Sequence, residues 1–188
     1  ARKRLWNLQV GKLRAMLRGI LPANRFYAAK FDALAMDPRR IRTIEDLRSL
    51  PFTTKKDLLG DQAAHPPYGT NLTYSLARYC RLHQSSGTAG VPLRWLDTRE
   101  SWDWFLGCWR TIYKTIGLER TDRLFFPFSF GPFLGFWGAF EGAARQGNLC
   151  LPGGGMTTIA RLRFMHENRV TVVACTPTYA LRMAEVAE

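Results

Sequence analysis

The sequence lacks the residue spacing that a zinc site or a disulfide framework needs. Its four cysteines stand at least 25 residues apart, no CxxC pair occurs, and its three histidines are equally scattered. Structural zinc sites usually draw their ligands from close pairs, and disulfide frameworks are typical of short secreted chains. We therefore expect no metal ligands and four reduced, buried thiols, as in a cytoplasmic protein.

Long apolar runs are also missing. No stretch approaches the ~20 apolar residues that span a bilayer, and no apolar core of signal-peptide length follows the basic start. With 46% hydrophobic and 22% charged residues, the composition is that of a globular chain with one or two domains. The chain begins at Ala1 and ends at Glu188 inside a predicted helix. We expect no transmembrane segment and a fragment of a longer protein.

Acidic residues are absent from the first 25 positions, where seven basic residues occur. The first 50 residues carry a net charge of +8 out of +12 for the whole chain. Apolar residues recur there at helical spacing, and Pro22 marks the predicted end of that helix: Leu5, Leu8, Leu13, Met16, Leu17, Ile20 and Leu21. A basic module for nucleic acid or anionic lipid is one interpretation. A solvated surface helix is the plainer one, because no interleaved aromatic and basic stripe favours nucleic acid.

Residues 1–75 read as a helical N-terminal segment, with Thr43 and Thr53 as helix N-caps. From residue 76 the pattern changes to α/β, with short strands at 76–83 and 93–96. Asp97 and Glu100 have the spacing of a capping box before a long helix that ends at Gly117. We therefore expect a domain boundary near residue 75.

Strands and helices alternate after residue 120. Strands are predicted at 124–128, 148–151 and 170–175, and helices at 132–146, 157–168 and 178–188. This order favours a parallel sheet with crossover helices. Such sheets bind ligands beyond the carboxyl ends of their strands, which directs attention to residues 129–133, 152–155 and 176–177.

The loop at residues 85–92 combines two glycines with three hydroxyl side chains. Glycine lets backbone N–H groups turn toward an anion, and hydroxyls can donate hydrogen bonds to phosphate oxygens. A Walker A loop is excluded because no lysine is present. By composition alone, an ordinary glycine and serine turn is the better interpretation.

In order, Ser85-Ser-Gly-Thr-Ala-Gly-Val-Pro92 resembles the phosphate loop of the adenylate-forming superfamily, which includes acyl-CoA synthetases and luciferases. Flanking segments narrow the resemblance to the phenylacetate-CoA ligase-like branch. They are Leu50-Pro-Phe-Thr-Thr-Lys-Lys-Asp-Leu58, Arg81-Leu-His-Gln-Ser-Ser-Gly87, Phe128-Ser-Phe-Gly-Pro-Phe-Leu-Gly135, Gly153-Gly154 and Cys175-Thr-Pro-Thr-Tyr-Ala-Leu181. The resemblance covers most of this chain but less than half of a complete family member.

The resemblance implies part of an α/β adenylate-forming N-terminal domain over residues 76–188. It implies an enzyme that uses ATP with Mg²⁺ to convert a carboxylic acid to an acyl-adenylate, from which coenzyme A displaces AMP. The residues that would hold the β,γ-phosphates are Ser85, Ser86, Gly87, Thr88 and Gly90. Two residues depart from the pattern: Ala89 replaces a second threonine, and Val91 replaces a lysine common in this branch.

By the same resemblance, an aromatic and glycine-rich stretch lines the acyl pocket and suits an aryl or arylacetic acid. Its residues are Phe130, Gly131, Phe133, Gly135 and Phe136. Simple core packing is the alternative. His83 is interpreted as a strand histidine with a structural hydrogen bond, and Tyr179 packs either beside the site or in the core.

The family's adenine-side motif, ribose-binding acid and catalytic lysine would all follow residue 188. We therefore expect this chain alone to be inactive. A divergent enzyme that transfers the acyl group to another acceptor also stays open, as does a homodimer.

Overall fold

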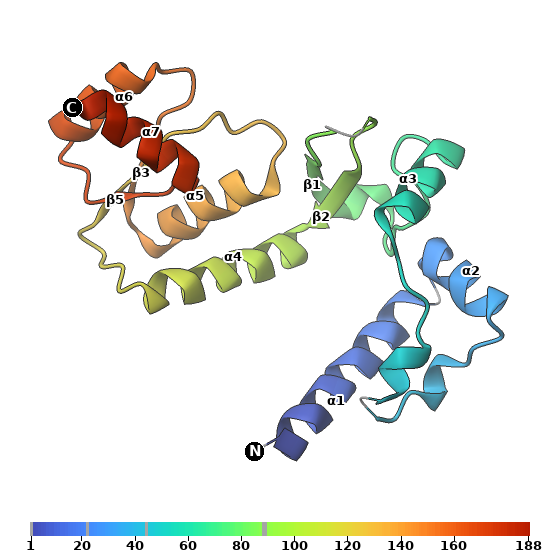
Figure 1. Cartoon of the computed structure of the whole chain (residues 1–188). Coiled ribbons are helices and arrows are strands. Elements are labelled where there is room, and N and C mark those ends of the chain that lie inside the picture. The colour runs from blue at the N-terminus through green and yellow to red at the C-terminus, as the bar shows by residue number, and fades with distance from the viewer. Residues whose placement is uncertain (1, 22, 44, 88–89) are drawn as a thin grey trace. The chain divides into compact units, whose positions relative to one another are not determined.

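The computed structural model describes the whole chain except residues 1, 22, 44, 88 and 89. It divides into two compact units. The first comprises Ala1–Arg81 and Gly87–Leu96, and the second comprises Leu82–Ser86 and Asp97–Glu188. The α-helices and most of the strands of both units are labelled in Figure 1.

The first unit is mainly helical. Its elements are α1 (Arg2–Ile20), α2 (Arg25–Ala33), η1 (Pro38–Arg40), η2 (Glu45–Ser49), α3 (Lys55–Ala64) and η3 (Leu76–Arg78). The predicted N-terminal amphipathic helix is confirmed as α1. Its Leu17 packs with Phe31 and Ile41 in a small buried cluster, and each of these side chains is at most 5% exposed.

The expected N-cap at Thr53 is wrong by one residue. Thr54 caps α3, because its hydroxyl accepts a hydrogen bond from Asp57 N at 3.2 Å and its own N–H donates to Asp57 Oδ2 at 3.0 Å. The acid at the third helical position thus selects the threonine three residues before it. Thr43 accepts a hydrogen bond from Asp46 N at 3.4 Å, at the start of a 3-10 helix.

Two strands, β1 (Tyr79–Gln84) and β2 (Arg94–Thr98), form a two-stranded sheet. The strand expected from Leu76 begins three residues later, because Leu76–Arg78 forms the 3-10 turn η3. The long helix α4 (Arg99–Thr115) follows β2, and the left-handed Gly117 (φ +75°) lies just beyond its end, as predicted. Its N-cap is Thr98 rather than Asp97: the Thr98 hydroxyl accepts from Ser101 N at 3.2 Å.

The second unit contains the predicted parallel sheet, with β3 (Arg123–Phe126), β4 (Leu149–Pro152) and β5 (Val172–Val173). The order is β4-β3-β5, and Leu124 stands opposite both Cys150 and Val172. The crossover helices are α5 (Leu134–Gln146) and α6 (Thr158–Glu167), and α7 (Pro177–Ala187) follows β5. The expectation of a helical N-terminal segment followed by a parallel α/β fold is confirmed.

The core of the second unit lies on the central strand. Leu124, Phe125 and Phe126 are fully buried, and the buried Tyr113 of α4 donates a hydrogen bond to Ala139 O of α5 at 2.6 Å. Gly142 allows α4 and α5 to pack closely, since a Cβ there would lie 2.7 Å from Trp109 Cβ. Within the described part of the chain, no helix is both long and apolar enough to cross a membrane.

Candidate functional site

Three loops follow the carboxyl ends of the parallel strands. Because β3 is central in the order β4-β3-β5, the segment after β3 leaves the sheet between its two neighbours. Residues 153–155 follow β4, and Thr176 caps α7 a few residues after β5. This edge of the sheet is where open α/β folds place their ligands.

A backbone hydrogen bond links two of the predicted site segments. Gln84 N, at the end of β1, donates to Pro132 O at 2.8 Å. Ser85 and Ser86 follow Gln84 directly and belong to the same unit as Pro132. The start of the glycine loop therefore lies beside the aromatic segment that follows β3.

From Gly87 on, the glycine loop belongs to the first unit and has a backbone hydrogen bond between its two glycines. Gly90 N donates to Gly87 O at 2.8 Å, and both glycines have positive φ: +68° at Gly87 and +119° at Gly90. A Cβ on Gly87 would lie 2.9 Å from Gly90 O and 3.2 Å from Pro92 Cγ. Gly87 is thus required by both its backbone conformation and its surroundings. Thr88 and Ala89 lie outside the described residues, and Val91 is 70% exposed.

The aromatic side chains of the predicted acyl pocket form a continuous cluster with Phe128. Its ring stacks on Phe136 with centroids 4.1 Å apart, and Phe133 meets Phe136 edge to face at 5.7 Å. Phe130 contacts Phe128 at 5.3 Å and also packs against the buried core. These rings form an apolar cluster, part of which serves core packing.

The two predicted pocket glycines differ in their surroundings. Gly131 has φ +46°, and its carbonyl accepts a hydrogen bond from Trp137 Nε1 at 2.7 Å. Gly135 is exposed, and a Cβ there would meet nothing within 4 Å. Gly131 therefore shapes the turn before α5. At position 135, by contrast, nothing in the surroundings requires glycine.

The loop after β4 packs tightly under this cluster. Gly153 N donates to Phe126 O at 2.9 Å, and a Cβ on Gly153 would lie 2.4 Å from Phe125 Cζ. The next residue, Gly154, lies against the aromatic segment, because its Cβ would be 3.3 Å from Phe128 O. The backbone of this loop approaches β3 more closely than any side chain would allow.

Arg161 joins this loop to α7. Its Nε donates to Gly153 O at 2.9 Å, and its Nη1 donates to the Tyr179 hydroxyl at 2.6 Å. Although burial acts to raise the pKa of Tyr179, the hydrogen bonds with Thr158 and Arg161 outweigh it and lower that pKa. Tyr179 thus lies beside the loops at the sheet edge. Sequence reasoning missed Arg161, since no local signal pairs it with a tyrosine 18 residues away.

His83 has the structural role expected from the sequence. It is 3% exposed, its Nδ1 lies 3.2 Å from Asp97 Oδ2, and its ring stacks on Trp102. The imidazole is thus enclosed by neighbouring side chains. Across the described residues, no group of three His, Cys, Asp or Glu side chains could hold a metal ion.

Known proteins with similar sequences align with nearly the whole length of this chain. No protein-family model matches it. It is 29% identical over 181 residues to a phenylacetate-coenzyme A ligase of Escherichia coli, and the alignment covers 96% of this chain and 40% of that protein. It is also 29% identical over 184 residues to the phenylacetate-coenzyme A ligase of Thermus thermophilus, covering 98% and 40%.

Among solved structures, 2-hydroxyisobutyryl-CoA ligase is similar in two states. The thioesterification-state complex with 2-HIB-AMP and CoA gives a TM-score of 0.91 at 26% identity, covering 100% of this chain and 40% of that one. The open conformation gives 0.87 at 25% identity, covering 95% and 39%. In sequence and fold, the chain is acyl-CoA ligase-like. The curated relatives that it matches are phenylacetate-coenzyme A ligases in particular, and it spans about 40% of their length.

Proposed function

We propose that this chain is the N-terminal portion of an AMP-forming acid–CoA ligase of the adenylate-forming superfamily, and that its substrate is an aromatic or arylacetic acid. The main observation in support is the hydrogen bond from Gln84 N to Pro132 O, which holds the start of the glycine loop beside the aromatic cluster. A ligase must bring the phosphates of ATP and the carboxylate together in just this way.

The glycine loop suits the phosphates of ATP. A carboxylate is a poor electrophile, and transfer of AMP to it gives a good leaving group. Charge that develops on the phosphoryl oxygens must meet oriented donors. We assign this task to Ser85, Ser86, Gly87, Thr88 and Gly90, of which Thr88 lies outside the described residues. The positive φ of Gly87 and Gly90 favours the turning of backbone N–H groups toward an anion.

The acid would lie against the aromatic cluster of the second unit, beside the loop after β4. Phe130, Gly131, Phe133, Gly135 and Phe136 are the proposed pocket residues, and the stacked rings favour an aryl group. The curated relatives act on phenylacetate, whereas the solved relative takes a 2-hydroxyisobutyryl group. Apolar walls alone do not separate one hydrophobic acid from another.

Magnesium and coenzyme A complete the proposed reaction. Mg²⁺ usually binds through phosphates with few protein ligands, and the described residues offer no preformed metal cluster. We therefore propose that the ion enters with ATP. The thiol of coenzyme A then attacks the acyl carbon of the adenylate and AMP leaves. We expect residues outside this chain to supply the adenine site and the catalytic lysine, so that the chain alone is inactive.

Residues 1–75 are, in this scheme, the helical N-terminal segment, and residues 76–188 are part of the nucleotide- and acyl-binding domain. We propose a cytoplasmic location from the four cysteines, all of which are free thiols. The expectation that they are buried is wrong: Cys80 is exposed, and the other three are partly exposed. A homodimer is compatible with the scheme and is tested by the molecular mass in solution.

Product analysis of the complete protein tests this function. We expect ATP, CoA and an aryl acid to give AMP, pyrophosphate and the aryl-CoA thioester, each identified by mass. Phenylacetate, benzoate and 2-hydroxyisobutyrate form the acid panel. Acyl-adenylate without thioester would instead support transfer to another acceptor, a candidate that the departures at Ala89 and Val91 favour. Absence of pyrophosphate release with every acid would refute both.

A further inference from the structure

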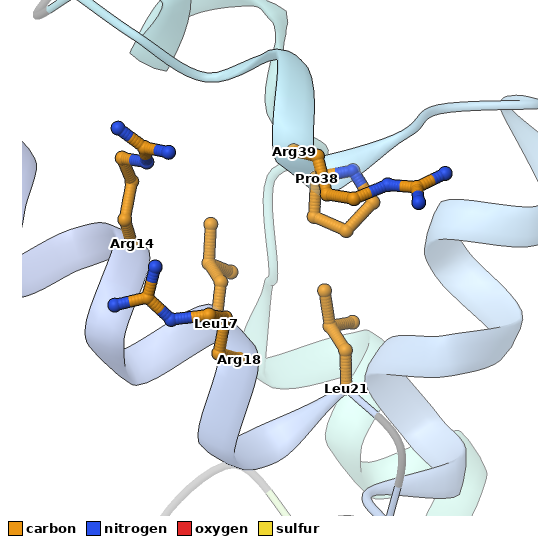
Figure 2. A pocket seen from close by; sticks show the side chains of 6 residues that line it. All are labelled: Arg14, Leu17, Arg18, Leu21, Pro38 and Arg39. Atoms are coloured by element: carbon orange, nitrogen blue, oxygen red, sulfur yellow. The ribbon is translucent and has the colours of Figure 1, made fainter.

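A small cavity in the first unit lies between α1 and η1, and none of its lining residues is assigned to ATP or the acid. Its volume is about 230 Å³, and it is lined by Arg14, Leu17, Arg18, Leu21, Pro38 and Arg39. Figure 2 shows the side chains of Leu17 and Leu21 directed toward the Pro38 ring, with Arg14 and Arg18 along one side. The cavity therefore combines an apolar floor with a cationic rim.

The cationic rim has no acidic partner among its lining residues. Helix α1 contains no acidic side chain, and Arg14 and Arg18 are four residues apart on it. Like charges at that spacing repel and destabilise a helix slightly. A bound anion would relieve this repulsion.

The third lining arginine, Arg39, is already paired with Asp37. Arg39 Nε donates to Asp37 Oδ1 at 2.9 Å, and the hydrogen bond from that guanidinium holds the pKa of Asp37 below its usual value. In Figure 2 the Arg39 guanidinium points away from Arg14 and Arg18. Asp37 is thus occupied by its neighbour, and the two lining arginines of α1, Arg14 and Arg18, remain for an external anion.

Size and polarity narrow the class of ligand. Pockets for drug-sized ligands enclose about 300–1,000 Å³, so a cavity of about 230 Å³ is too small for a nucleotide. Inorganic phosphate would make no apolar contact with the floor that Leu17, Leu21 and Pro38 form. A carboxylate suits the planar fork of a guanidinium, and a compact apolar body suits the floor.

We propose that this cavity, here named the α1 pocket, is an accessory binding site for a small apolar monocarboxylate. The carboxylate pairs with Arg14 and Arg18, and the hydrocarbon part contacts Leu17, Leu21 and Pro38. The site shares no residue with the aromatic cluster of the second unit. It does not depend on the proposed ligase activity.

Site-resolved titration of the ¹⁵N-labelled chain tests this site. The probes are phenylacetate and phenylacetamide, which match in size but differ in charge. We expect phenylacetate to shift backbone amide signals at the α1 pocket, namely those of Arg14, Leu17, Arg18, Leu21 and Arg39. We expect the neutral amide to bind at least about tenfold more weakly, because it cannot form the charged pair.

Variants of the rim give the matched control. The double variant Arg14→Gln/Arg18→Gln should weaken phenylacetate binding at least about tenfold, and about 0.5 M salt should weaken binding to the unchanged chain. Lys12→Gln removes a charge from the same helix outside the pocket and should leave the affinity unchanged. Changes in the amide signals of Phe130 and Phe136 report binding at the aromatic cluster. The two sites are therefore tested independently of each other.

Three results would overturn the site. They are equal binding of acid and amide, unchanged affinity in the double variant, and shifts that avoid the α1 pocket. A loss of affinity as large in Lys12→Gln as in the double variant would show only general attraction to the basic helix.

Discussion

Gly153→Ala should destabilise the second unit, because the loop after β4 has no room for a side chain. The new methyl group would lie 2.4 Å from Phe125 Cζ, 2.7 Å from Phe125 Cε2 and 3.1 Å from Pro127 Cα. Phe125 is fully buried and cannot swing into solvent. The loop itself must therefore move away from β3.

That movement sets the magnitude. Overpacking in a filled core costs about 1–3 kcal/mol. Displacement of Gly153 also strains its hydrogen bonds to Phe126 and Arg161, which measure 2.9 Å each. For a chain of this size, about 1 kcal/mol lowers the melting temperature by roughly 2–4 °C, so we expect a total fall of roughly 2–12 °C.

Urea denaturation and thermal melting, followed by circular dichroism, measure this effect. The matched control is Gly107→Ala in α4, where a Cβ would meet nothing within 4 Å. There alanine should stabilise the helix by up to about 1 kcal/mol, since glycine costs backbone entropy. Equal stability of Gly153→Ala and the unchanged chain, or a loss matched by Gly107→Ala, would refute the close approach.

Three further effects follow from single side chains. Tyr113→Phe removes a buried hydrogen bond and should cost about 0.5–1.5 kcal/mol in urea denaturation; an unchanged midpoint would contradict that bond. The hydrogen bond from Lys30 lowers the pKa of Asp57 to about 2. The unchanged chain should therefore be more stable than Asp57→Asn above about pH 4, and this difference should vanish as the pH falls toward 2. A difference in stability that persists at about pH 2 would show another cause. Cys80 is exposed, whereas burial raises the pKa of the Cys150 thiol to about 11, so alkylation monitored by peptide mass should label Cys80 at least about tenfold faster; equal rates would contradict the burial.

Local sequence signals predicted the elements of the second unit well. The stripe of α4 and the left-handed glycines after α4 and α5 are properties of neighbouring residues. Caps were less secure, because adjacent Asp97 and Thr98 can both accept a hydrogen bond and only the backbone path decides between them. The chosen path places Asp97 beside His83 and leaves Thr98 to cap the helix.

The candidate site was predictable only as separate segments. The glycine loop and the aromatic stretch were recognisable from their residues, but the bond from Gln84 to Pro132 joins positions 48 apart and depends on the folded sheet. The contact of Arg161 with Tyr179 likewise depends on how α6 and α7 pack. Distances of this kind come from tertiary structure, which no local pattern specifies.

Acid-dependent exchange of pyrophosphate into ATP tests the central claim most directly. The complete protein should catalyse this exchange only with an apolar carboxylic acid present, and Gly87→Ala should abolish it, because a side chain at φ +68° would meet Gly90 O at 2.9 Å. Phenylacetate and phenylacetamide give the matched substrate pair, of which only the acid should support exchange. No exchange with any acid, or equal exchange in the Gly87→Ala variant, would contradict the assignment of this loop to the phosphates of ATP.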